Sequence, residues 1–322
     1  MRVAVVLAAL LPRVAHCEEQ AAQSKQPRTW DKLDRQHEAL GTLLEDILRR
    51  TDALFSGEKN QDAPTGSYVA LGARTRLPLT SNADGSTGLL GRAKIRLPNT
   101  QERLQILIGQ DVERVGTTQA QKDAEEAAGI RERSDNPFVA LRGIARETLA
   151  LQLTADAGLR FDGIEPDPFV RGRARRLFEP GEWLLSLSET LLWQRSEAFT
   201  ANTEFGLYRA LGRKHALSME TQAEWRDKTD GFDLAQTLTL SWRINERSLG
   251  ALELGAFAET QPRFEATAYS IAARYRRKVY SDWLLVELRP QVTFPRDNDY
   301  DTTVTFTLQF EAYFGSNYLN NL

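Results

Sequence analysis

Apolar and polar residues alternate strictly along the run 302–314, near the end of the chain. One face of this run carries Val304, Phe306, Leu308, Phe310, Ala312 and Phe314. Threonine, glutamine, glutamate and tyrosine side chains occupy the other face. A period of two in polarity is typical of a β-strand with one apolar and one polar face. The run therefore predicts a strand that ends on an aromatic residue.

The same alternation recurs from Tyr68 onward, in runs separated by turn residues. The predicted strands cover 68–77, 88–97, 102–110, 137–146, 149–161, 168–177, 182–195, 199–211, 216–226, 232–244, 249–259, 265–276, 283–294 and 302–314. Their number is about fourteen, and single-chain bacterial β-barrels have an even number of strands. Twelve strands remain an alternative, because 249–259 alternates poorly and Glu189 falls in the apolar set of 182–195. One bulge in either run would change the phase of the strand. Gln236 interrupts the apolar row of 232–244 in the same way.

The length of these runs suits a membrane. Ten residues that rise ~3.3 Å each and tilt by ~45° span roughly 23 Å, close to the ~25 Å apolar band of an outer membrane. No run in the sequence approaches the ~18 consecutive apolar residues that a spanning helix needs. The mean hydropathy of −0.44 agrees with a barrel, in which only every second strand residue is apolar. We therefore predict an all-β, antiparallel, up-and-down transmembrane β-barrel.

The predicted connections alternate in length. If both ends of the barrel are periplasmic, the periplasmic turns are short, as at 147–148 and 212–214. The longest gaps, 78–87 and 111–136, then fall on the extracellular side. Short periplasmic turns and long extracellular loops are the rule for outer-membrane barrels.

The amino-terminal residues predict export and a separate leader. Residues 1–17 combine Arg2, an apolar stretch and a small-residue cleavage site before Cys17, as a secretory signal peptide does. A lipid anchor on Cys17 is disfavoured by the bulky His16 before it. Cys17 is the single cysteine of the chain, so a disulfide framework is excluded. The predicted order is a signal peptide at 1–17, a periplasmic leader at 18–66, the barrel at 67–315 and a tail at 316–322.

Within the leader, residues 30–55 predict an amphipathic helix followed by a linker at 56–66. Its seam repeats every seven residues at Leu33, Leu40, Ile47 and Leu54. One reading places this helix on the rim or in the lumen of its own barrel. The other is a periplasmic coiled coil for self-association or for a periplasmic partner.

The aromatic-ended strand, residues 304–314, resembles the carboxy-terminal signature of Gram-negative outer-membrane proteins. The hairpin DWLLVELRPQVTFPRDNDYD at 282–301 is similar to the ends of uncharacterised, porin-like outer-membrane barrel proteins of proteobacteria. The resemblance covers about Tyr68 to Gly315, implies outer-membrane localisation and implies that barrel assembly machinery reads the last strand. It names no solute. The tail SNYLNNL departs from the signature, which usually ends the chain.

If the apolar sets face lipid, the polar sets line the lumen, because a Lys or Arg facing lipid costs about 2–4 kcal/mol at the midplane. The predicted basic wall comprises Arg74, Arg76, Arg92, Lys94, Arg96, Arg142, Arg171, Arg173, Arg175, Arg274 and Arg276, with Arg146 beside them. The predicted acidic wall comprises Glu204, Glu220, Glu224, Glu287 and Glu311. Such a field would orient and select solutes, with a bias toward anions. Alternatively, the charges form ion pairs that brace a closed barrel.

Other chemistries find little support. The net charge of −3 argues against nucleic-acid binding. Only His37 and His215 follow the signal peptide, and neither is placed as a general base in a lumen, so we expect no catalytic residues, no metal site and no cofactor. The acidic loop 295–301 offers oxygen ligands for weak Ca²⁺ binding, but a solvated surface loop is the preferred reading. The sequence thus predicts a channel or binding barrel for small polar, anionic solutes. The alternative is a non-conducting scaffold whose helix holds a periplasmic partner.

Overall fold

A computed structural model describes residues 67–97, 103–110, 136–148, 150–280 and 282–314. The predicted signal peptide, the leader with helix 30–55, most of the 111–136 loop and the 316–322 tail lie outside the described residues. The described part of the chain holds no helix that is both long and apolar enough to cross a membrane.

Strands account for nearly all of the described chain. They are β1 (Tyr68–Pro78), β2 (Ser86–Leu97), β3 (Leu104–Gln110), β4 (Pro137–Glu147), β5 (Leu151–Asp162), β6 (Glu165–Phe178), β7 (Trp183–Gln194), β8 (Ala198–Leu211), β9 (His215–Arg226), β10 (Gly231–Asn245), β11 (Ser248–Glu259), β12 (Glu265–Tyr280), β13 (Leu284–Pro295) and β14 (Thr303–Phe314). A single turn of 3-10 helix, η3 (Arg296–Asn298), lies between β13 and β14.

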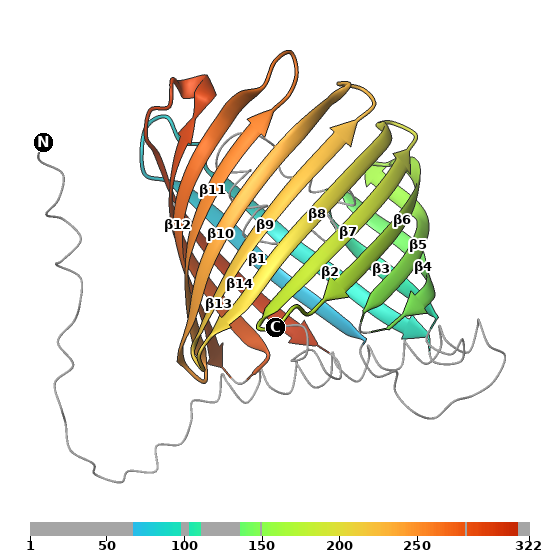
Figure 1. Ribbon diagram of the computed structural model, residues 1–322, viewed down its shortest axis with the longest axis horizontal. Coiled ribbons are helices and arrows are strands. Elements are labelled where there is room, and N and C mark those ends of the chain that lie inside the picture. The colour runs from blue at the N-terminus through green and yellow to red at the C-terminus, as the bar shows by residue number, and fades with distance from the viewer. Residues whose placement is uncertain (1–66, 98–102, 111–135, 149, 281, 315–322) are drawn as a thin grey trace, which may run out of the picture. The chain divides into compact units, whose positions relative to one another are not determined.

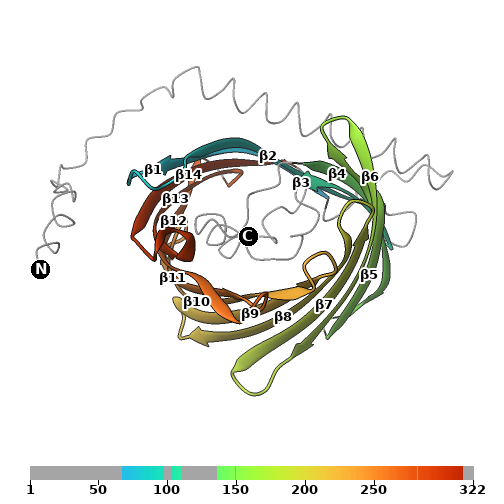
Figure 2. The ribbon, with the colours of Figure 1, turned by 90° about the horizontal axis from the view of Figure 1, so that it is seen from above.

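The strands form a closed, antiparallel barrel (Figure 1). Each strand pairs with the next one in the chain, and β14 returns to pair with β1 over residues Val69↔Phe314 to Pro78↔Thr305. Figure 2 shows the resulting ring seen along its axis. Closure leaves no strand edge with unpaired backbone groups, which a bilayer could not solvate.

The prediction of fourteen strands is confirmed, and the alternative of twelve is excluded. Each predicted run is a strand, with the largest differences at β6, which begins at Glu165, and β12, which continues to Tyr280. The pairing of β7 with β6 and β8 shows no register shift, so Glu189 belongs to the same face as Leu187 and Leu191. In β11 a register shift between Phe257 and Ala258 bends the pairing with β12 without ending the strand.

Polar residues face inward and apolar residues face outward. In β14, Thr305 and Gln309 are 2% and 5% exposed, whereas Phe310 on the other face is 44% exposed. This polarity is opposite to that of a water-soluble protein, and it is stable only where hydrocarbon surrounds the barrel. Along each strand, the apolar residues of the alternating pattern therefore face the bilayer and the polar residues face the lumen.

The turns agree with this orientation. Tyr68 and Phe314, the two ends of the barrel, lie at one end of the cylinder, here named the periplasmic end. A three-residue turn joins β8 to β9 there, and Gly212 takes a positive φ of 74° in it. A side chain would strain this backbone, so glycine is the suitable residue. The other end of the cylinder is named the extracellular end.

Candidate functional site in the barrel interior

The strand register gives the predicted charged residues an inward orientation. Arg92 lies opposite Ala70, Arg142 opposite Asp156, and Glu220 opposite Thr237, in each case on the buried face. The remaining basic and acidic positions named from the sequence share the parity of these residues. Arg146 does not: a register shift after Ile144 places it opposite Leu153 of the outward set.

The best-buried ion pairs surround Asp156 of β5. Arg142 of β4 donates from Nε to Oδ1 at 2.7 Å and from Nη2 to Oδ2 at 2.9 Å. Arg171 of β6 donates from Nε to Oδ2 at 2.8 Å and also from Nη2. The carboxylate is fully buried and the Arg171 side chain is 1% exposed. Two guanidinium groups therefore share one carboxylate, and one positive charge remains in excess.

A second cluster with the same composition centres on Glu253 of β11. Arg289 of β13 approaches its Oε2 at 2.7 Å, and Arg274 of β12 approaches its Oε1 at 3.1 Å. Arg289 is 1% exposed and Glu253 is 3% exposed. Here, too, two arginines meet one carboxylate across neighbouring strands.

Glu311 of β14 anchors a third cluster toward the periplasmic end. Arg276 donates to its Oε2 at 2.9 Å, Arg92 approaches the same oxygen at 3.5 Å, and the Tyr313 hydroxyl donates to it at 2.6 Å. Glu287 lies 4.0 Å from Arg276. Because β2 is reached across β1, this cluster ties together strands from both ends of the chain.

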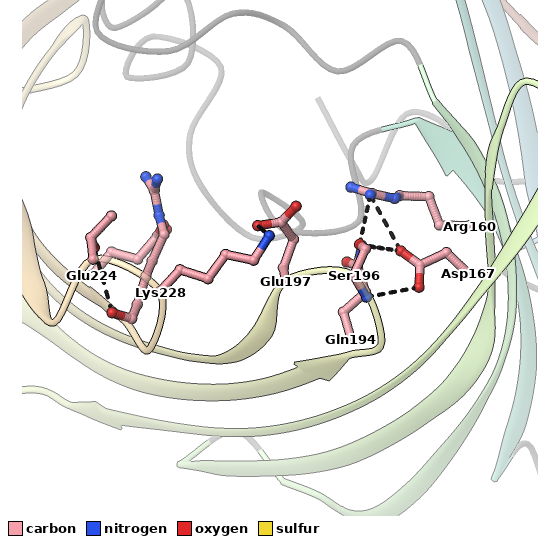
Figure 3. Close-up of polar contacts among 9 residues, drawn as sticks. Arg160, Asp167, Gln194, Ser196, Glu197, Glu224 and Lys228 are labelled. Carbon is pink, nitrogen blue, oxygen red and sulfur yellow. Dashed lines mark hydrogen bonds and ion pairs between the residues drawn. The ribbon is translucent and has the colours of Figure 1, made fainter.

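A fourth group of polar residues lies at the extracellular end of β5–β8 (Figure 3). Asp167 accepts hydrogen bonds from Gln194 Nε2 at 2.6 Å, from Arg160 Nη2 at 3.3 Å and from the Ser196 hydroxyl. Next to it, Lys228 pairs with Glu197 at 3.2 Å. These contacts connect the strand ends and the turns between them, and they fix the rim.

An apolar cluster separates the rim from the Asp156 cluster. It consists of Leu107, Phe138, Ala140, Phe169 and Leu192 from β3–β7. The rings of Phe138 and Phe169 meet edge to face, with centroids 6.0 Å apart. Along the barrel axis, the interior face of these strands therefore has a charged layer at the rim, an apolar layer below it and a second charged layer at Asp156.

The basic character is greatest on β6. Arg171, Arg173 and Arg175 alternate along its inward face. Arg173 donates from Nε to the Ser188 hydroxyl at 2.8 Å and from Nη2 to Glu204 at 2.9 Å. Arg176, the next residue, lies on the outer face over the ring of Phe178.

Several central residues were missed from the sequence. Asp156, Glu253, Arg289, Asp167 and Arg160 all have the inward parity of their strands, so alternation alone identifies their face. The alternation of each strand, applied to every charged strand residue and not only to runs of one sign, is the signal that identifies them.

The described ranges also place the residues that were considered for metal binding and catalysis. No three His, Cys, Asp or Glu side chains come together there as metal ligands. His215 lies opposite Trp242 on the outer face of β9 and β10. In the loop 295–301, Arg296 donates to Glu259 at 2.6 Å, and this bond raises the pKa of Arg296 above its ordinary value.

Comparison with known proteins identifies similar folds among solved structures. No protein-family model and no curated protein matches the sequence. Among solved structures, OprB of Pseudomonas putida matches with a TM-score of 0.52 and 10% identity, over 82% of this chain and 96% of that chain. An anion-selective porin from Comamonas acidovorans matches with a TM-score of 0.45 and 9% identity, over 77% of this chain and 98% of that chain. The KdgM porin in complex with oligogalacturonate matches with a TM-score of 0.38 and 6% identity, over 76% and 98%.

The likeness to OprB concerns architecture. It agrees with the closed fourteen-strand barrel, the apolar outer surface and the polar interior described above. A cylinder of this kind is suited to span a lipid bilayer, since its strands pair in a closed ring and most of its outward side chains are apolar. The chain therefore has a porin-like β-barrel fold of the kind that spans a membrane.

Proposed function

We propose that the barrel is a channel for small, polar, anionic solutes. The observation that carries the proposal is the row of Arg171, Arg173 and Arg175 on the inward face of β6. Rings or rows of Arg and Lys favour anions in pores, because a low-dielectric wall focuses their field on the lumen.

The ion pairs of the interior do not cancel this field. The Asp156 and Glu253 clusters each hold two arginines and one carboxylate, so each keeps one positive charge. Lys94 and Arg175 add further cationic groups toward the periplasmic end. An anion in the lumen thus meets an excess of positive charge on β2–β6 and a second one on β11–β13.

The test is ion selectivity in planar bilayers under a salt gradient. The wild-type reversal potential should indicate anion preference. Arg175→Gln should lower the anion-to-cation permeability ratio about 10-fold, since a charge ~6 Å from the ion path in water stabilises an anion and destabilises a cation by ~0.7 kcal/mol each. Arg176→Gln is the matched control: it removes the same charge one residue away, on the outer face, and should leave the ratio unchanged. Equal effects of the two variants, or cation preference in the wild type, would refute the proposal.

A closed scaffold is the second candidate, and the bracing contacts favour it. Glu311 of β14 connects to Arg276 of β12 and Arg92 of β2, strands that are not its hydrogen-bonded neighbours, as struts in a filled barrel would. In that case helix 30–55 would hold a periplasmic partner. Conductance should be measured with the full chain and with a chain that lacks residues 18–66. Silence in both favours the scaffold, conductance in both favours the channel, and conductance only after deletion makes the leader a plug.

The proposal includes two further partners. Following the resemblance noted in the sequence, β14 is the strand that barrel assembly machinery reads. The helix 30–55 is the segment that self-associates or engages a periplasmic protein. Export and assembly of variants truncated before residue 56 or altered at Phe314 would test these parts separately.

A further inference from the structure

A carboxylate lies at the middle of the outward face of β7. Glu189 is the central residue of a set that otherwise consists of Trp183, Leu185, Leu187, Leu191 and Trp193. Its Oε2 accepts a hydrogen bond of 2.6 Å from the hydroxyl of Thr203, directly opposite on β8. Within the described strands, no other outward-facing set has a charged residue at its middle. Hydrocarbon offers nothing to the other acceptor positions of this carboxylate.

A second polar pair lies two strands away on the same face. Thr221 of β9 donates to Oε1 of Gln236 of β10 at 2.7 Å, and Nε2 of Gln236 donates to the carbonyl of Glu220 at 3.2 Å. The amide group has two N–H donors, so one donor is directed elsewhere. Gln236 is thus an outward-facing hydrogen-bond donor in a row that otherwise consists of apolar residues.

The two pairs form one continuous band across β7–β10. Thr203 lies opposite Ala223, and Thr221 is the next outward residue of β9 after Ala223. The band therefore consists of an acid at one edge, an amide at the other edge, and small side chains between them. Ala201 and Ala223 flank Thr203, so this part of the band is low and allows a second surface to approach closely, whereas Phe205 stands opposite Thr221 at its periplasmic side.

The two edges of the band lie within ~5 Å of one another in membrane depth. Because the strands tilt, a row of paired residues climbs around the barrel: the row that includes Arg243, near the periplasmic end of β10, reaches Gln309 within β14. The row from Glu189 climbs in the same sense toward β10. The band steps back by two residues toward the periplasmic end at Thr221 and Gln236, which offsets about half of the climb and leaves ~5 Å for the two long side chains to span.

We propose that this band is the interface for a second copy of the same barrel. A two-fold axis along the membrane normal, between β8 and β9, places β7 of one copy against β10 of the other. Glu189 of each copy then accepts a hydrogen bond from the amide of Gln236 of the second copy, twice per dimer. Such reciprocal contact is the signature of a two-fold interface.

The occupant follows from this complementarity. A lipid chain offers no donor to Glu189 and no acceptor to Gln236. A foreign protein would need both groups at the matching spacing and depth. A second copy brings them by symmetry alone, and it needs neither an open lumen nor the leader helix. The proposal is therefore independent of conduction.

Site-directed cross-linking in liposomes tests the interface. Ala223→Cys lies beside the proposed axis and should cross-link to its own copy upon oxidation, in a Cys17→Ala background. Ala155→Cys, on the outer face of β5, is the matched control and should give only the low yield of random encounters. Heat-modifiable migration on a gel establishes that each variant is folded before cross-linking.

Gln236→Leu tests the contact itself. It removes two hydrogen bonds per dimer and places an apolar residue against lipid, so the barrel should fold normally. The dimer dissociation constant, measured from cross-linking yield against protein-to-lipid ratio, should rise about 10- to 100-fold.

Three outcomes would overturn the proposal. The first is that Ala223→Cys cross-links no better than Ala155→Cys. The second is that Gln236→Leu leaves the dimer dissociation constant unchanged. The third is that, in native envelopes, Ala223→Cys cross-links to a protein of different mass and forms no dimer.

Discussion

Asp156 offers the sharpest test of how the interior is held together. The substitution Asp156→Asn keeps the size of the side chain but removes its charge and turns one acceptor oxygen into an amide donor. Arg171, 1% exposed, then faces an N–H group where it had a carboxylate oxygen. Arg142 is 17% exposed and loses the bond to Oδ2.

The expected cost follows from burial. Removing one partner of a buried ion pair typically destabilises by about 3–5 kcal/mol, because a charge is left in a poor environment. Arg142 recovers part of its solvation in a water-containing lumen, so the lower half of this range, about 3–4 kcal/mol, is the prediction. An exposed pair is worth at most about 1 kcal/mol, and Glu182→Gln is the control, since Glu182 is 76% exposed beside Arg209.

The assay is reversible urea unfolding of the barrel in lipid vesicles, followed by tryptophan fluorescence. The midpoint should fall in Asp156→Asn with an unchanged slope, and stay near the wild-type value in Glu182→Gln. In the double variant with Arg171→Met, part of the loss should be recovered, because neither charge remains buried alone. A loss below about 1 kcal/mol for Asp156→Asn would refute the reasoning, since a buried, four-bonded carboxylate cannot behave as an exposed one.

Two other predictions follow from the wall and from its field. Gly158→Ala should destabilise the barrel by about 1–3 kcal/mol in the same unfolding assay, because the added Cβ would meet the Val139 carbonyl oxygen at 2.3 Å and the Ala140 Cβ at 2.7 Å. Gly172→Ala is the control: its Cβ would have no atom within 4 Å, so the variant should be neutral or slightly stabilising. Anion preference should weaken between 0.1 M and 1 M salt, because the Debye length falls from ~10 Å to ~3 Å and the fixed charges are screened. If the permeability ratio calculated from the reversal potential stays the same at both concentrations, selection does not depend on the fixed charges.

The fold could be predicted from alternation because in a barrel this pattern has a single physical cause. Each strand lies between hydrocarbon and a polar interior, so every second residue reports its face, as in β14. The strand ends at β6 and β12 could not be predicted, since strands continue past the bilayer where polarity no longer constrains them. A carboxylate on the lipid face is costly, so Glu189 suggested a bulge in its strand. The regular pairing of β7 shows that the strand has no bulge and that Glu189 faces outward.

The partners of the interior charges could not be predicted in the same way. Alternation gives the face of a residue but not its height or its neighbours across strands. Arg92 and Glu311 are separated by 219 residues and meet only because β14 closes against β1. The shear of the barrel decides such contacts, and the shear is a property of all fourteen registers together.

Bracing and selection are therefore not competing uses of the same residues. A carboxylate shared by two arginines fixes both guanidinium groups and still leaves a positive charge, as at Asp156 and Glu253. Loss of the carboxylate should then weaken the barrel and increase anion preference, whereas loss of Arg175, which lies outside these clusters, should reduce anion preference with little effect on stability. If the two properties instead changed in parallel across such variants, the interior would be a single brace, and its charge would have no separate role.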